Sequence, residues 1–188
     1  MSHSLHLAVA DEVHRRLDNR FELVRDPACG GSHQLPLFIG RRKARDTRMC
    51  CVDLLVIQSG KVHAIIEIEE SGFIPTKICG KFLQAALATH FIHDSRAEAA
   101  IPYADEVLFI QVLDGSKCLK PGTRKDSQGE LIEQQIQSML PLRGITDYRL
   151  VFISGKSDQR GLTSAGEAIA MALPNKANSA DAKNRAAD

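Results

Sequence analysis

The feature that most constrains this fold is a pair of apolar runs, residues 49–57 and 61–69, separated only by residues 58–60. Both runs are rich in Val, Ile and Leu, which fit the half-buried surface of a sheet. A short link that contains glycine between two such runs predicts a β-hairpin. We predict a three-residue loop in which Gly60 takes the left-handed backbone conformation.

The loop length sets which residues share a face of the hairpin. A three-residue loop places Ile57 opposite Lys61. In that register Asp53 and Glu67 are diagonal neighbours on one face, with backbones roughly 7 to 8 Å apart. The other face is wholly apolar and is predicted to be the core face; it holds Val52, Leu54, Val56, Val62, Ala64, Ile66 and Ile68. A two-residue loop would send Asp53 to the opposite face from Glu67, and the all-apolar face argues against it.

The acids of this hairpin predict a site for a hard cation. Asp is disfavoured in strands, yet Asp53 is flanked on both sides by apolar residues. Two carboxylates on one sheet surface repel each other unless a proton or a cation lies between them, and oxygen ligands suit Mg²⁺ or Mn²⁺. We therefore predict that Asp53 and Glu67 bind Mg²⁺ (or Mn²⁺), whereas Glu70, at the end of the strand, is expected to face water.

These residues resemble the PD-(D/E)XK nuclease superfamily, the restriction-endonuclease-like proteins. The resemblance covers about residues 5–155 and is carried by Asp53 and, after an interval of thirteen residues, by Glu67-Ile68-Glu69, on a hairpin between two helices. It implies that the Asp and the Glu bind the metal ion. The proline of the family pattern is absent, because Val52 precedes Asp53.

The position two residues beyond the Glu is usually Lys in this superfamily and orients or activates the attacking water. Glu69 stands there, as in a minority of restriction enzymes, so the resemblance makes it a catalytic candidate. Alternatively, a lysine of the following helix replaces it, since Lys77 and Lys81 lie on one face, four residues apart. An acid of the first helix can also reach the metal in this superfamily, so Glu12 is either an accessory ligand or an ordinary helix-surface residue.

Apolar periodicity along the rest of the chain predicts an α/β fold. Helices are predicted over residues 4–17, 76–93, 130–140 and 163–173, and strands over 21–25, 106–113 and 149–153. With the hairpin, this order gives the αβββαβ core that the resemblance implies, a mixed central sheet flanked by helices. We predict a single nuclease-like domain over residues 1–173 and a disordered tail over 174–188, which lacks apolar periodicity.

Charge points to a local surface for nucleic acid. The net charge is only +1, so the chain as a whole does not attract nucleic acid, and binding has to come from a patch. Five cations lie within eight residues and lead directly into the run that carries Asp53; they are Arg41, Arg42, Lys43, Arg45 and Arg48. Arginines beside a metal site would hold a phosphate backbone against it.

Composition indicates a cytoplasmic protein. No stretch approaches the roughly 20 apolar residues that span a bilayer, and the N-terminal residues lack the pattern of a signal peptide. The five cysteines show no CxxC pair, and an odd number suits reduced thiols. A zinc site is therefore not expected, and neither is a membrane partner.

The sequence thus predicts a metal-dependent endonuclease of the restriction or repair type that hydrolyses DNA phosphodiester bonds. Its partner would be double-stranded DNA, and a restriction enzyme of this kind would act as a homodimer on a palindromic site. The alternative is a nuclease-like domain without catalysis that binds nucleic acid or protein; the missing lysine and the near-neutral charge favour it. A third reading, a carboxylate metal enzyme with another substrate, is disfavoured by the Arg41 to Arg48 cluster.

Overall fold

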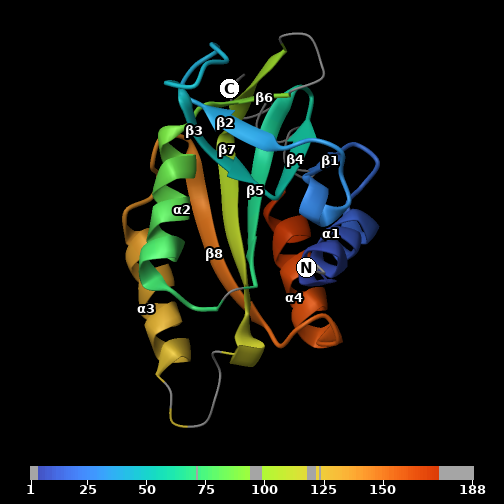
Figure 1. Ribbon diagram of the computed structural model, residues 1–188, viewed down its shortest axis with the longest axis vertical. Helices are drawn as coiled ribbons and strands as arrows, with labels where there is room; N and C mark the ends of the chain where they lie inside the picture. Colours follow the sequence, from blue (N-terminus) through green and yellow to red (C-terminus); the bar gives the residue numbers. More distant parts are fainter. Residues whose placement is uncertain (1–3, 71, 94–98, 118–121, 123, 174–188) are drawn as a thin grey trace, which may run out of the picture.

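A curved mixed β-sheet with helices on both faces forms the molecule (Figure 1). The computed structural model describes residues 4–70, 72–93, 99–117, 122 and 124–173, so the predicted tail at 174–188 lies outside the described residues. The helices are α1 (Ser4–Arg16), α2 (Pro75–Leu87), α3 (Lys125–Ser138) and α4 (Gln159–Ala172), with single 3₁₀ turns η1 (Pro27–Cys29) and η2 (Gly115–Lys117). None of the described helices combines the length and the hydropathy needed to cross a bilayer.

The strands are β1 (Glu22–Arg25), β2 (Leu35–Phe38), β3 (Arg48–Val52), β4 (Leu54–Gln58), β5 (Lys61–Glu69), β6 (His90–Ile92), β7 (Ala100–Asp114) and β8 (Ile145–Ile153). Their order is β1-β4-β5-β7-β6-β2-β3, and β8 also pairs with β7. Strands β1, β4 and β5 are antiparallel neighbours, whereas β5, β7 and β8 run parallel. A parallel pair needs a crossover connection, and α2 lies in the one between β5 and β7. The predicted α/β class with a mixed sheet flanked by helices is confirmed.

Both faces of the central hairpin are buried, which corrects the prediction of a single core face. Leu54, Val56, Ala64, Ile66 and Ile68 pack with α1 and α4, as predicted for the apolar face. On the other face, Leu55 and Ile65 belong to a second core formed with α2, α3 and strands β2 and β6. Parallel strands covered by helices on both faces carry apolar residues in continuous runs, so alternation did not reveal the second core.

The hairpin register also differs from the prediction. The loop has two residues, Ser59 and Gly60, with φ of 51° and 71°, and Gln58 pairs with Lys61. Two successive positive φ angles are typical of a type I′ turn, whose twist matches that of the strands. A β-bulge then inserts His63, because Ile57 pairs with Val62 whereas Val56 pairs with Ala64. The bulge shifts the register of β5 by one residue. Continued past Leu54 and Ile66, the shifted register places Asp53 level with Glu67, whereas without the bulge Asp53 would be level with Ile66.

The helix predicted over residues 76–93 ends early. Helix α2 stops at Leu87, Ala88 is extended, and His90–Ile92 form β6 between β2 and β7. Phe91 and Ile92 are good strand residues whose backbone groups are satisfied by this pairing. Strand β2 was not predicted, since it is short and contains Pro36, which cannot donate to a ladder.

The N-terminus of α1 is held by Glu70, which corrects the expectation that this residue only faces water. One carboxylate oxygen of Glu70 accepts hydrogen bonds from the backbone of Leu5 at 2.9 Å and of His6 at 3.4 Å, and it lies 3.1 Å from His6 Nδ1. A carboxylate at a helix N-terminus satisfies free N–H groups and complements the helix dipole. This contact fixes α1 beside the end of β5.

We expect Glu70→Gln to destabilise the protein by about 1 kcal/mol at neutral pH. Burial alone would raise the pKa of Glu70, but the hydrogen bonds from His6 and Leu5 hold it below its ordinary value. A lowered pKa contributes stability above the unfolded-state pKa and loses it as the pH falls through the folded-state pKa. Urea unfolding at pH 7 and pH 3 measures this, with exposed Glu106→Gln as the control. An equal loss at both pH values would contradict the charge argument.

Candidate functional site

Asp53 lies at a corner of the chain. Strand β3 ends at Val52 and pairs with β2, whereas β4 begins at Leu54 and pairs with β1 and β5. The corner is fixed by two hydrogen bonds, from the backbone N–H of Asp26 to the Asp53 carbonyl at 2.9 Å and from the N–H of Ile68 to Asp53 Oδ2 at 2.6 Å. The predicted continuous run 49–57 is therefore divided, because Asp is a poor strand residue and its side chain binds the neighbouring backbone instead.

Glu67 lies beside Asp53. The β4–β5 register, extended by one residue from the pair Leu54 and Ile66, sets Asp53 opposite Glu67. Glu67 is only 3% exposed. Burial raises its pKa to about 8, and the Asp53 charge and a hydrogen bond between the two carboxyl groups add to the shift. Burial also raises the pKa of Asp53. The two acids thus converge, and the pair needs a proton or a cation.

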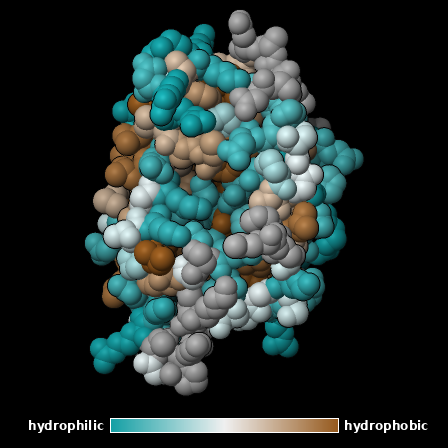
Figure 2. Space-filling model, in the orientation of Figure 1, coloured by the Kyte–Doolittle hydropathy of each residue, from teal (hydrophilic) through white to brown (hydrophobic). Residues whose placement is uncertain are grey.

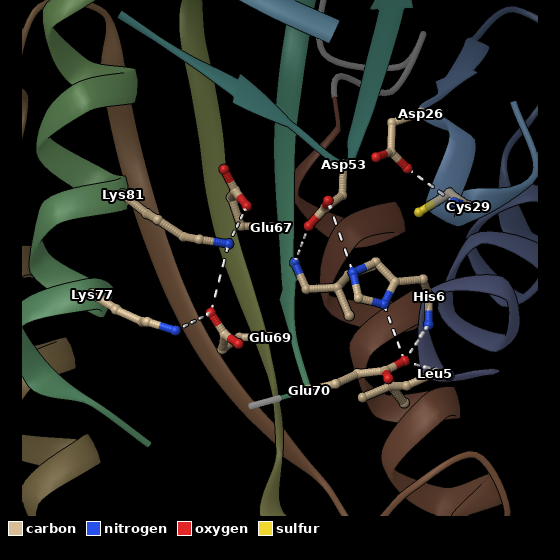
Figure 3. Close-up of polar contacts among 11 residues, drawn as sticks. Leu5, His6, Asp26, Cys29, Asp53, Glu67, Glu69, Glu70, Lys77 and Lys81 are labelled. Atoms are coloured by element: carbon tan, nitrogen blue, oxygen red, sulfur yellow. Dashed lines mark hydrogen bonds and ion pairs between the residues drawn. The ribbon is translucent and has the colours of Figure 1, made fainter. Parts of the chain in front are cut away.

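Lys81 reaches this pair from α2 (Figure 3). Its Nζ lies 2.7 Å from Glu67 Oε2 and 3.9 Å from Glu69 Oε2, and Lys77 Nζ lies 3.8 Å from the same oxygen of Glu69. Burial lowers the pKa of Lys81, but the negative charge of Glu67 and its hydrogen bond outweigh this and raise it overall. Of the two helix lysines predicted as replacements, Lys81 forms an ion pair with Glu67, whereas Lys77 forms one with Glu69.

The residue of α1 that approaches the site is His6, which sequence reasoning did not select. Its Nε2 lies 3.9 Å from Asp53 Oδ1, and its Nδ1 lies beside Glu70, so it bridges the two acids (Figure 3). The expectation for Glu12 is not met. The Glu12 carboxylate is bound by Arg15 at 2.7 Å and by Arg16 at 2.5 Å and packs near Gly166 of α4. Glu12 is a buried ion-pair residue that joins two helices.

The polar neighbourhood of Glu67 includes Gln111, the Tyr148 hydroxyl bound to it, and Cys50, none of which was selected from the sequence. Gln111 of β7 is its partner in the parallel ladder, is 1% exposed, and accepts a hydrogen bond from the Tyr148 hydroxyl at 2.7 Å. Cys50 also lies close to Glu67. Burial raises the pKa of the Cys50 thiol to about 12, and the negative charge of Glu67 is the second largest cause. A polar Gln within the apolar run 107–113 was the one signal for this neighbourhood.

The predicted basic residues lie in and beside the loop between β2 and β3. Arg42 binds Asp46 at 2.6 Å, and Arg48 begins β3. Asp53 follows Arg48 by five residues, which is about 17 Å along an extended chain. The basic loop therefore adjoins the carboxylate site through a single strand without contacting it.

Asp53 and Glu67 are the side chains that would hold Mg²⁺ at this site. Among the residues that the structure describes, no group of three or more His, Cys, Asp and Glu side chains is arranged to hold a metal ion. Mg²⁺ is commonly bound through one or two carboxylates, with waters and substrate phosphates completing its shell. Asp53 and Glu67 are two adjacent carboxyl groups of the kind that bind such an ion, and Lys81 is the positive charge beside Glu67 in this structure.

Comparisons with known proteins give no relative from which to transfer a function. No family model, no curated protein and no solved structure matches the chain.

Proposed function

We propose that this chain is a Mg²⁺-dependent nuclease that hydrolyses DNA phosphodiester bonds. The observation that carries the proposal is the convergence of the part-buried Asp53 and the buried Glu67, whose pKa is raised by burial and by the Asp53 carboxyl group, with Lys81 at 2.7 Å from Glu67. Acids whose pKa is raised by burial and by a neighbouring charge are a marker of functional sites. A purely structural position would be occupied at lower cost by apolar residues.

The order of elements gives further support. With β2, β3 and β6 left aside as insertions, the order is helix α1, the antiparallel strands β1, β4 and β5, helix α2 and the parallel strand β7. This order is compatible with the αβββαβ core that the resemblance to the PD-(D/E)XK superfamily implies. Asp53 directly precedes β4, the second of the three antiparallel strands, and Glu67 lies in β5, the third.

Each residue has a role in the proposed reaction. Asp53 and Glu67 would hold Mg²⁺, which supplies Lewis-acid stabilisation of the phosphoryl oxygens and favours ionisation of the attacking water. Lys81 would take the part that Lys plays two residues beyond the Glu in most of the superfamily: it would donate to the attacking water or to the developing negative charge. Glu69 lies near both lysines and would orient them, so we propose it as a positioning residue.

A second candidate function rests on the Lys81 contact itself. Lys81 already places a positive charge beside Glu67, so the protein supplies a cation for its own acids. A domain in which this ion pair is permanent would bind nucleic acid or protein without cleaving it. The two candidates differ in whether a divalent ion binds to the folded chain.

A titration with Mg²⁺ distinguishes them. We expect the free energy of unfolding to rise with Mg²⁺ by about 2.7 kcal/mol at a hundredfold excess over Kd. The gain should be larger at pH 8.5 than at pH 6, because the ion competes with the proton held by Glu67, whose pKa is raised to about 8. Thermal unfolding measures the binding of Mg²⁺, and nicking of supercoiled plasmid measures cleavage. NaCl at matched ionic strength is the control for both. Stability independent of Mg²⁺, together with intact plasmid, would favour the second candidate.

A further inference from the structure

A pocket of about 460 Å³ opens between β2, β3 and the loop of residues 39–47. Its lining includes Gln34, Lys43 and Arg45, together with Arg48 and Cys51 of β3. Hydrophilic side chains gather at this end of the molecule (Figure 2), where Figure 1 places the light-blue loop above β2 and β3. The volume lies within the range of small-ligand sites, so this is a concave site and not only a charged surface.

The pocket is lined by positive charge. Three of its described lining residues are cationic, Lys43, Arg45 and Arg48, and none of those described is acidic. Asp46, the one acid of the loop, is bound by Arg42, and this hydrogen bond holds the pKa of Asp46 below its ordinary value. Within the described part of the chain, Arg45 and Arg48 form no ion pair. Two free guanidinium groups that face one cavity favour an anion with several oxygens.

The loop that carries these cations is held in one shape. Thr47 Oγ1 accepts a hydrogen bond from the Ala44 N–H at 3.2 Å and donates to the Arg42 carbonyl at 2.7 Å. Gly40, with φ of 74°, donates its N–H to Thr89 Oγ1 at 2.8 Å and ties the loop to the start of β6. A merely solvated run of charges needs no such bracing, whereas a fixed loop lowers the entropic cost of binding.

The number of residues between the pocket and Asp53 limits how far the pocket lies from the two carboxylates. Cys51 precedes Asp53 by two residues and Arg48 precedes it by five, which is about 7 and 17 Å along extended chain. These are the largest separations that the backbone allows. Duplex DNA rises 3.4 Å per base pair along the helix axis, so 17 Å spans about five base pairs. A group held in the pocket therefore lies within about five nucleotides of one held at Asp53 and Glu67.

Resting on the nuclease function proposed above, we propose that this pocket binds one phosphoryl group of the nucleic-acid substrate, within about five nucleotides of the scissile bond. Internal backbone phosphates and a terminal phosphate offer the same chemistry. The pocket thereby fixes the register of the strand over the carboxylates, a role that free surface lysines cannot perform.

The first test needs no catalysis. Inorganic phosphate is titrated into the ¹⁵N-labelled full chain, and we expect saturable shifts in the amide signals of Arg45, Arg48 and Cys51. The double variant Arg45→Gln/Arg48→Gln should lose them. Arg160→Gln, which makes the same change at an exposed arginine of α4 outside the pocket lining, should retain them. Shifts that are absent in the wild type, or equal in the double variant, would overturn the proposal even if plasmid nicking is observed.

The second test identifies the source of the phosphate. Affinity for a duplex labelled at its 3′ end is measured by anisotropy in EDTA, with either a 5′-phosphate or a 5′-hydroxyl. The double variant should bind about tenfold more weakly, with a salt slope flatter by about one unit, as one lost phosphate contact requires. A wild-type preference for the 5′-phosphate that the double variant lacks assigns the terminal group, and equal affinities assign an internal one. Duplex binding by the double variant as tight as by Arg160→Gln would refute both assignments.

Discussion

Asp53→Asn and Glu67→Gln should each reduce Mg²⁺-dependent plasmid nicking by about 10³-fold, while the protein stays folded. Each change keeps the size of the side chain and removes one of the two charges that would hold the ion. In EDTA, Glu67→Gln should be more stable than the wild type at pH 8.5. The raised pKa of Glu67 means that the folded state loses stability as the pH rises from about 4.5 to about 8, and the amide removes this loss.

Matched controls separate this effect from a general loss of charge. Asp105 and Glu106 are exposed acids at the other end of β7, so Asp105→Asn and Glu106→Gln make the same chemical changes away from the site. Both control variants should nick plasmid at the wild-type rate. Wild-type rates for Asp53→Asn or Glu67→Gln would end the case for catalysis at this pair, and unfolding measured in parallel shows whether lost activity reflects lost structure.

Lys81→Met should give the second large effect, on stability as well as on activity. The change removes the cation 2.7 Å from Glu67 and leaves two buried acids together. We expect a loss of about 3 kcal/mol in the free energy of unfolding at pH 8.5 in EDTA. The loss should be much smaller at pH 5, since Glu67 is then protonated in the folded state and does not require the lysine. Nicking should fall by at least about 10²-fold.

Lys77→Met is the matched control for this prediction. Lys77 lies one turn before Lys81 on α2, its side chain is 49% exposed, and its Nζ lies 3.8 Å from Glu69 Oε2. Its loss should cost no more than about 1 kcal/mol at either pH and leave nicking within about threefold. If the two variants behave alike, the assignment of Lys81 as the lysine of the site is wrong. Full activity with lost stability would make Lys81 a structural counter-ion only.

The hairpin shows how far the apolar pattern could lead. The prediction that Asp53 and Glu67 lie together is correct in outcome, although the register that led to it is wrong. The type I′ turn at Ser59 and Gly60 moves the register by one residue, and the bulge at His63 moves it back. Nothing local in the sequence marks a serine for a positive φ or a histidine for a bulge. Only the burial of both faces of the sheet selects that combination.

The candidate site divides in a similar way. Asp53 and Glu67 could be selected because acids within apolar strand segments are rare and therefore informative. Lys81 was reached from helical spacing, but the preference for it over Lys77 depends on which turn of α2 lies over β5. His6 carried no sequence signal of its own, since a helix histidine is an ordinary surface residue until packing buries it. Gln111 carried only one, its polar side chain within an apolar run.

The sequence by itself determined the elements whose pattern is local: the hairpin, the first helix, the buried strands, and the presence of two acids where an apolar side chain would be expected. The tertiary structure alone decided where α2 ends, which lysine contacts the acids, and that Glu12 belongs to an arginine pair and Glu70 to a helix terminus. The physical reason is that a residue's preference for helix or strand depends on its near neighbours, whereas the partner of a charge depends on which distant segment the packing of two cores brings within a few ångströms.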